Sequence, residues 1–176
     1  MEIGCGKNDL FNSVPASDKV GVDPVSGGTI RLSSDSFFKN NKDQYDFVFI
    51  DGLHEYSQAF NDLKNSINVL SKSGGWVFLH DMLPSSCAEQ LVPRVSQSWT
   101  GDVWKILADL KASNVDFKVI AFDHGICAIR VRSKDKIVIE KVSENLDYLD
   151  YKNLLNSLPL LNSFDDFQLW VDSNEI

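Results

Sequence analysis

The chain opens with Met1-Glu2-Ile3-Gly4-Cys5-Gly6, in which two glycines follow a short apolar start. Glycines at this spacing let the backbone turn sharply and approach a ligand where a Cβ would collide. The next apolar run, Val20-Gly21-Val22, ends at Asp23, where a carboxylate can bind the two hydroxyls of a ribose. Together these features predict a site for a cofactor with an adenosine half. Because almost no strand precedes the glycines, we also expect that the chain is truncated at its N-terminus.

The composition is that of one globular domain. The chain has 176 residues, of which 43% are hydrophobic and 24% charged. Its net charge of −8 disfavours binding to a phosphate backbone, and no apolar run is long enough to span a membrane. The three cysteines are widely spaced and suggest neither a disulfide framework nor a zinc site. We therefore expect a cytoplasmic protein with no nucleic-acid or membrane partner.

Short apolar runs alternate with helical patterns. Residues 20–22, 47–50 and 76–79 are predicted to form buried parallel strands, since each run is short, apolar and followed by an acid or a histidine. Between the second and third runs, one apolar face at helical spacing predicts a helix that ends at Ser73-Gly74-Gly75. The residues of that face are Tyr56, Phe60, Leu63, Ile67 and Leu70.

The second half predicts an antiparallel pair. Residues 117–122 and 126–131 flank Asp123-His124-Gly125, a short turn typical of a hairpin. In the tail we expect a strand at 137–139 and then a leucine-rich helix through residue 161. The predicted fold is α/β, a Rossmann-like and mostly parallel sheet with helices on both faces and a C-terminal antiparallel hairpin. Residues 1–135 would form the cofactor-binding domain, and residues 136–176 an extension packed on it.

In such a sheet the ligand lies outside the carboxyl ends of the strands. The predicted strand ends carry the two glycines, Asp23, Asp51 and His80-Asp81, so we expect these groups to converge. A dinucleotide-binding loop would have a third glycine at position 9, but this chain has Asp9, which would repel a pyrophosphate. A cofactor without phosphates, such as S-adenosylmethionine, tolerates an acid there, and its sulfonium suits an acidic pocket.

The order of these segments resembles that of class I S-adenosylmethionine-dependent methyltransferases, and the segments at residues 50–56 and 79–81 resemble a small-molecule O-methyltransferase branch. The resemblance covers most of residues 1–131. The segments that carry it are Glu2-Ile3-Gly4-Cys5-Gly6 and Val20-Gly21-Val22-Asp23-Pro24, then Tyr45 through Tyr56 with Ile50-Asp51-Gly52-Leu53-His54-Glu55-Tyr56, and finally Gly74 through Asp81 with Leu79-His80-Asp81.

The resemblance implies a role for each matching residue. Gly4 and Gly6 would pass under the methionine part of the cofactor, with Glu2 supporting the loop. Asp23 would hold the ribose hydroxyls, and Asp51 would lie near the methyl group that is transferred. Ser34 and Asp35 would lie near the adenine. The family usually has another glycine where this chain has Asn8, a residue that tolerates positive φ better than most.

Methyl transfer to oxygen requires that the acceptor loses its proton. The candidates for this task are His80, the preferred base, and His54, which could instead be a contact at a helix N-terminus. The resemblance also implies that Asp51 and Asp81, with His80, could hold a divalent metal such as Mg²⁺. The alternative for each of these side chains is a structural role in local hydrogen bonds.

The sequence therefore predicts an S-adenosylmethionine-dependent methyltransferase for a small hydroxylated acceptor such as a sugar, and leaves a homodimer open. Two other classes remain. One is a non-catalytic descendant of the methyltransferase fold that still binds the cofactor. The other is an NAD-dependent oxidoreductase, against which Asp9 argues.

Overall fold

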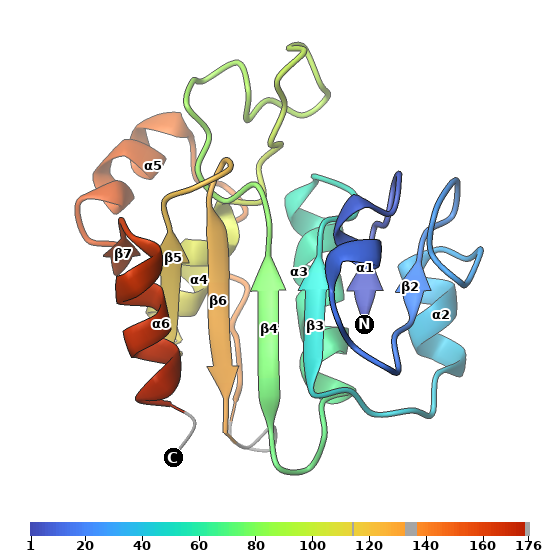
Figure 1. Cartoon of the computed structure of the whole chain (residues 1–176). Helices are drawn as coiled ribbons and strands as arrows, with labels where there is room; N and C mark the ends of the chain where they lie inside the picture. Colours follow the sequence, from blue (N-terminus) through green and yellow to red (C-terminus); the bar gives the residue numbers. More distant parts are fainter. Residues whose placement is uncertain (114, 133–136, 175–176) are drawn as a thin grey trace.

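A computed structural model describes residues 1–113, 115–132 and 137–174 of the chain. Within these residues seven strands form one sheet in the order β2-β1-β3-β4-β6-β5-β7 (Figure 1). The strands are β1 (Glu2–Ile3), β2 (Gly21–Val22), β3 (Phe47–Ile50), β4 (Gly75–Leu79), β5 (Phe117–Ile120), β6 (Ile126–Val131) and β7 (Leu160–Leu161).

The first four strands are parallel and end in one row. Ile3 pairs with Val22 on one side and with Ile50 on the other, and Ile50 pairs with Leu79. These four residues are the last of their strands, so the residue that follows each of them leaves the sheet at the same edge. This register brings together the candidate site residues, which follow the ends of these strands.

Helices cover both faces of the sheet, as the sequence predicts. In the view of Figure 1, α3 and α4 lie behind the sheet, while α1 and α6 lie in front of it. The helices are α1 (Asp9–Ser13), α2 (Ser34–Asn40), α3 (Tyr56–Asn68), α4 (Lys105–Ala112), α5 (Tyr148–Leu155) and α6 (Phe164–Asp172). The α/β Rossmann-like class with a mostly parallel sheet is therefore confirmed.

The larger core lies between the sheet and the pair α3 and α4. The predicted apolar face of α3 is buried there, with Leu63 fully shielded from solvent. Leu107 and Leu110 of α4 are equally shielded, and Trp104 just before α4 is also fully buried. Burying this apolar area stabilises the sheet, and the strand ends above it are thereby held in place.

The C-terminal half contains the predicted antiparallel hairpin, formed by β5 and β6, and β6 also pairs antiparallel with β4. The details of the tail differ from the prediction. Residues 137–139 form no strand, and the edge strand is instead Leu160–Leu161, which pairs parallel with β5. Leucine suits a helix and a buried strand alike, so the pattern could not distinguish them.

Helix α6 was also absent from the prediction. It begins after Ser163, whose side chain accepts a hydrogen bond from the backbone N–H of Asp166. Trp170 packs edge-on against Trp76 of β4 at a centroid distance of 5.2 Å. Among the described residues, no helix is long and apolar enough to cross a membrane.

Candidate cofactor pocket and histidine cluster

The common edge of the parallel strands gathers the residues that the sequence singled out. Gly4, Asp23, Asp51 and His80 each follow the last residue of a strand, and those last residues are in register. The strand order places Asp23 and Asp51 on opposite sides of Gly4, with His80 beyond Asp51. The predicted convergence is therefore present.

The glycine loop needs its first glycine for two reasons. Gly4 has a φ of +83°, which is rare for residues with a side chain. A Cβ on Gly4 would also lie only 2.0 Å from the backbone oxygen of Asp51. The loop thus packs directly on the backbone at the end of β3, and any other residue at position 4 would push the two apart.

Asp23 is the anchor of this loop. One carboxylate oxygen accepts hydrogen bonds from the backbone N–H groups of Cys5 and Gly6, each at 3.0 Å. The other oxygen accepts from the N–H groups of Val25 and Ser26, each at 2.7 Å. Burial opposes ionisation, but these four donors more than offset it and lower the pKa of Asp23 below its usual value.

This arrangement bears on the role that the resemblance implies. A carboxylate offers about four lone-pair sites, and backbone donors occupy all four in Asp23. Hydroxyls of a ribose could reach it only by sharing or replacing those bonds. The carboxylate therefore shapes the loop first, whatever it binds in addition.

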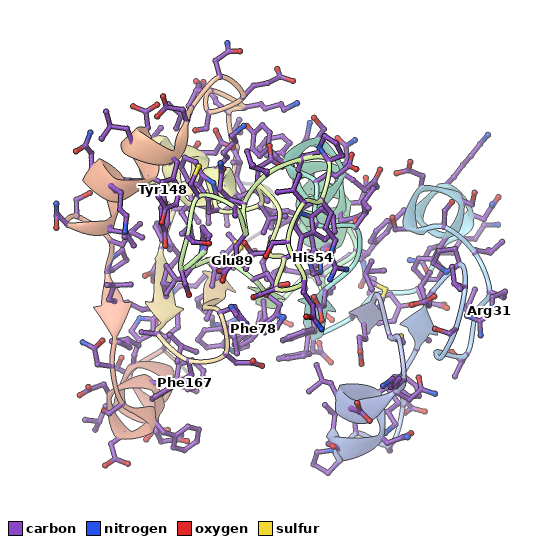
Figure 2. All side chains as sticks on the ribbon, turned by 90° about the horizontal axis from the view of Figure 1, so that it is seen from above. Arg31, His54, Phe78, Glu89, Tyr148 and Phe167 are labelled. Atoms are coloured by element: carbon purple, nitrogen blue, oxygen red, sulfur yellow. The ribbon has the colours of Figure 1, made fainter. Side chains whose placement is uncertain are left out.

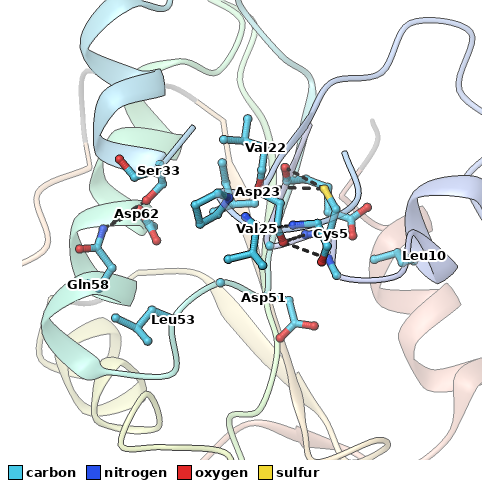
Figure 3. A pocket seen from close by; sticks show the side chains of 18 of the residues that line it. Cys5, Leu10, Val22, Asp23, Val25, Ser33, Asp51, Leu53, Gln58 and Asp62 are labelled. Atoms are coloured by element: carbon cyan, nitrogen blue, oxygen red, sulfur yellow. Dashed lines mark hydrogen bonds between the residues drawn. The ribbon is translucent and has the colours of Figure 1, made fainter. Parts of the chain in front are cut away.

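A cavity of about 700 Å³ lies beside the glycine loop (Figure 3). Its size suits a nucleoside-sized ligand. Predicted site residues from four separate segments line it, and Leu10, Val25 and Leu53 add apolar surface. The predicted residues in its wall are Glu2, Gly4, Gly6, Asp23, Ser34, Asp35 and Asp51.

One side of the cavity carries a polar network from α2 and α3. The side-chain N–H₂ of Gln58 lies 3.2 Å from the Ser34 hydroxyl, 3.2 Å from the Asp35 carboxylate and 3.1 Å from that of Asp62. One amide with two protons thus faces three acceptors. Such an acceptor-rich wall favours a ligand that brings a donor, as the exocyclic amine of adenine does.

Asp62 lies at the back of this network and is almost completely buried. Desolvation raises the pKa of its carboxyl to about 6, although hydrogen bonds from Ser34 and Gln58 partly oppose the shift. Among the described carboxyls whose pKa has a resolved value, that of Asp62 therefore lies closest to neutral pH.

A second group of titratable side chains adjoins the cavity at Asp51. We call it the histidine cluster, and it consists of Asp51, His54, His80, Asp81 and Asp123. Asp51 lies 3.2 Å from His54 Nε2 and 3.4 Å from His80 Nδ1. His54 Nδ1 lies 3.0 Å from Asp81, and His80 Nε2 lies 3.2 Å from Asp123.

The cluster strongly favours charged side chains. Burial alone would lower the pKa of His80, but Asp51 above all, together with Asp81 and Asp123, raises it to about 9. His54 is shifted in the same direction, because its bond to Asp51 and the charge of Asp81 outweigh burial. Burial likewise opposes ionisation of Asp51, but the two histidines lower its pKa well below the usual range.

These shifts matter for the predicted base. An imidazole with a pKa of about 9 carries a proton at neutral pH, so His80 as it stands donates rather than accepts. It can act as a base only after it has lost that proton. A cation that replaces the proton at Nδ1 would instead make His80 a ligand, because the cation uses the lone pair of that nitrogen.

The donor set of the cluster fits a divalent metal. Among the described residues, Asp51, His80 and Asp81 each offer a ligand atom, and these atoms lie within 4.8 Å of one another. His80 Nδ1 is buried and makes no well-directed hydrogen bond within the described part of the chain. Carboxylate oxygens suit Mg²⁺, and the imidazole additionally suits metals such as Mn²⁺ or Zn²⁺.

The long segment after β4 runs over this cluster. Seen from above, it passes over His54 and carries Glu89 (Figure 2). Trp99 stacks on the His54 ring at 5.3 Å, and its backbone oxygen lies 3.2 Å from His54 Nδ1. Leu91, Val92 and Val95 of the same segment expose apolar side chains. The segment thus provides an apolar surface next to the charged cluster.

Comparison with known families agrees with this geometry. Residues 19–82 match the family model of a methyltransferase domain. This match supports a class I S-adenosylmethionine-dependent methyltransferase domain over these residues. The match covers a little over a third of the chain and runs from β2 to the residues just after β4. It thus includes Asp23, Asp51, His54 and His80. No curated protein matches the chain.

Sequence reasoning missed several residues of the candidate site. Gln58 and Asp62 lie one helical turn apart at the margin of the apolar face of α3, and a helical-wheel plot could have marked them as polar residues close to the core. Asp123 belongs to a hairpin turn far along the chain. Only the pairing of β6 with β4 brings that turn to the cluster.

Proposed function

We propose that this methyltransferase binds S-adenosylmethionine in the cavity beside the glycine loop and methylates an oxygen of a small hydroxylated acceptor, such as a sugar. The observation that carries the proposal is the position of Asp51. Its side chain lines the cofactor cavity and also contacts both histidines of the histidine cluster. The proposed cofactor site and the proposed proton-handling groups therefore meet at one residue.

In this proposal each part of the cavity has a task. The loop at Gly4 and Gly6, supported by buried Glu2, faces the methionine end of the cofactor. The acceptor-rich network around Ser34, Asp35 and Gln58 supports recognition of the adenine amine. When bound, S-adenosylmethionine supplies an activated methyl group. The protein then has to align the acceptor and take up its proton.

The proton is the task of the histidine cluster. Asp51 and Asp81 hold His54 and His80 in place; they raise the pKa of both imidazoles, and that of His80 to about 9. We assign the base to His80, with His54 as the second candidate. The hydroxyl of the acceptor would bind between the cluster and the apolar segment that contains Trp99.

The proposal includes a divalent cation held by Asp51, Asp81 and His80, with Mg²⁺ as the first candidate. Such an ion supplies Lewis acidity toward the acceptor hydroxyl. The buried Nδ1 of His80 supports it, because among the described residues this atom makes no well-directed hydrogen bond and faces Asp51 at 3.4 Å and Asp81 at 3.8 Å. With the cation bound, His80 would be a neutral ligand and no longer the base, because its Nδ1 lone pair would be shared with the ion, and His54 would take the role of base.

Isothermal titration with S-adenosylhomocysteine tests the cofactor part. We expect saturable binding, and the absence of heat at high micromolar ligand would contradict the proposal, as would tight binding of NADH instead. Methyl transfer is then followed as release of S-adenosylhomocysteine with panels of sugars and phenols, with and without Mg²⁺. Cofactor binding without turnover on any acceptor would favour a non-catalytic descendant of the fold.

A pair of variants distinguishes a specific role of Asp51 from a general effect of net charge. Asp51→Asn removes a charge from the cluster, and we expect it to abolish turnover on an acceptor that the unmodified protein methylates. Asp165→Asn removes a charge from exposed Asp165 of α6, remote from the cavity lining, and should leave turnover unchanged. Equal loss in both variants would indicate a general effect of net charge.

A further inference from the structure

The β5–β6 turn carries a carboxylate into the histidine cluster. Asp123 and His124 both have positive φ, +45° and +58°, and the N–H of Gly125 donates to the backbone oxygen of Phe122 at 2.8 Å. This is the geometry of a tight hairpin turn with two left-handed residues. From this turn the Asp123 side chain reaches His80 Nε2 at 3.2 Å.

The turn is held firmly against the end of β4. The backbone N–H of Met82 donates to the oxygen of Gly125 at 3.0 Å, and that of Leu83 donates to the oxygen of His124 at 2.6 Å. A Cβ at Gly125 would lie 2.4 Å from Leu83 Cγ, so the two segments are in close contact. The position of Asp123 is therefore set by backbone bonds and not by its own exposed side chain.

The two nitrogens of His80 meet different surroundings. Nε2 faces Asp123 near the surface, where 76% of the Asp123 side chain is exposed. Nδ1 is buried and points toward the acid pair, 3.4 Å from Asp51 and 3.8 Å from Asp81. In neutral imidazole, the hydrogen bond made by one nitrogen determines which nitrogen keeps its lone pair. An acceptor at Nε2 retains the proton there and leaves the lone pair at Nδ1.

We propose that Asp123 is a positioning residue, which fixes the ring and tautomer of His80 so that Nδ1 can complete a cation site with Asp51 and Asp81. The inference rests on the cation part of the proposed function. A carboxylate behind a metal-binding histidine is a common device, and its loss typically weakens metal binding about 10- to 100-fold. Here the device comes from a hairpin outside the segment matched by the methyltransferase family model.

The presence of a carboxylate at position 123, where a neutral side chain would repel the other acids less, supports this assignment. The cluster already contains Asp51 and Asp81, and the whole chain has a net charge of −8, so a further carboxylate adds repulsion between acids. A solvent-exposed turn with positive φ could be formed equally well by Asn or Gly. A role at His80 accounts for an aspartate in this position.

The test uses Zn²⁺ alone as a diamagnetic probe of the full chain. We expect Asp123→Gly, which accepts the positive φ, to weaken Zn²⁺ binding in calorimetry about 10- to 100-fold. Asp123→Asn keeps an acceptor oxygen and should restore most of that affinity. Asp165→Asn removes the same charge from α6 and should bind Zn²⁺ like the unmodified protein.

Nitrogen NMR of the Zn²⁺-loaded protein gives a second readout. We expect one tautomer of His80, with the proton on Nε2 and the metal at Nδ1, and in Asp123→Gly a mixture or a metal at Nε2. Unchanged affinity and an unchanged tautomer in Asp123→Gly would overturn the inference. So would an unmodified protein that binds no Zn²⁺.

Titration of the same variants with S-adenosylhomocysteine distinguishes this failure from that of the proposed function. Asp123 does not line the cofactor cavity, so cofactor binding should be equal in all of them. A protein that binds the cofactor but shows no effect of Asp123 on Zn²⁺ refutes the positioning role alone. A protein that binds neither ligand refutes both proposals.

Discussion

Asp23 and Asp51 follow the two strands that flank β1 and its glycine loop, but the protein stabilises these two carboxylates in different ways. Asp23 accepts from four backbone N–H groups and lies 3.6 Å from the guanidinium of Arg31, and none of these donors loses its proton near neutral pH. Asp51 is bonded by two histidine side chains, whose charge depends on pH. The two ends of one sheet edge therefore have different chemical characters.

The difference shows how one fold combines binding with proton transfer. Backbone donors give the Asp23 end a permanent shape, which suits the binding of a cofactor that is itself unchanged in charge by pH near neutrality. Side-chain donors give the Asp51 end groups that can gain and lose protons or exchange them for a cation. Variants of Asp23 and of Asp51 should accordingly lose different properties.

The largest expected effect is that of Asp23→Ala. It leaves four buried or half-buried N–H groups without their acceptor, so we expect the free energy of unfolding to fall by about 3 kcal/mol. The glycine loop should lose its shape, and affinity for S-adenosylhomocysteine should fall at least roughly 100-fold, or ~2.7 kcal/mol. Urea denaturation and calorimetry measure the two changes.

Asp23→Asn is the matched control. It keeps one oxygen for two of the N–H groups and should therefore lie between the unmodified protein and Asp23→Ala in both measurements. If Asp23→Ala kept its stability but lost ligand binding, Asp23 would act mainly as a ribose contact, and the contrast with Asp51 would be weaker than we describe.

The next effect is the pH dependence of the histidine cluster. The pKa of His80 is raised from 6.5 to about 9, so its stabilising contribution is complete below pH 6.5 and is lost as pH rises through about 9. We expect unfolding free energy, measured by urea denaturation with chelator present, to decrease over this range by an amount on the order of 3 kcal/mol.

Asp51→Asn should flatten this decrease, because the main cause of the His80 shift is removed. Proton NMR of the His80 ring should then show a pKa lower by at least about one unit. Asp23→Asn should leave the His80 pKa in place. A similar shift in both variants would show that the two ends of the edge are electrostatically coupled.

A smaller effect is expected at Asp62, in the wall of the cofactor cavity. Its pKa is raised to about 6, so folding favours the protonated form, and this advantage is lost as pH rises from about 4 through about 6. Asp62→Asn removes the penalty and should raise stability at pH 7 by about 2 kcal/mol, with little gain at pH 4. Thermal unfolding at both pH values tests this, and an equal gain at both would contradict it.

The smallest effect is expected at Asn8, where related methyltransferases usually have glycine. Asn8 has a φ of +69°, and its side-chain oxygen accepts a hydrogen bond from the N–H of Gly28 at 2.6 Å. Asn8→Gly keeps the backbone freedom but loses that bond, and should reduce stability by about 1 kcal/mol. Asn8→Ala loses both the tolerance of positive φ and the hydrogen bond, and should reduce stability further. Urea denaturation of the two variants distinguishes these two contributions.

The first half of the fold could be predicted from the sequence because its signals are local. Phe47–Ile50, the apolar face of α3 and the strand ending at Leu79 each show a period or a boundary within a few residues. The tail could not be predicted, because Leu160–Leu161 becomes a strand only by pairing with β5, and leucine alone does not specify that pairing.

For the candidate site, the sequence by itself determined which acids and histidines follow the parallel strands, and hence that they meet at one edge. Only the tertiary structure decided what each one contacts. Asp23 is committed to backbone donors, His80 carries a proton, and Asp123 arrives from a distant hairpin. The physical reason is that strand periodicity is written in neighbouring residues, whereas hydrogen-bond partners and pKa values depend on groups that are brought together only when the sheet assembles.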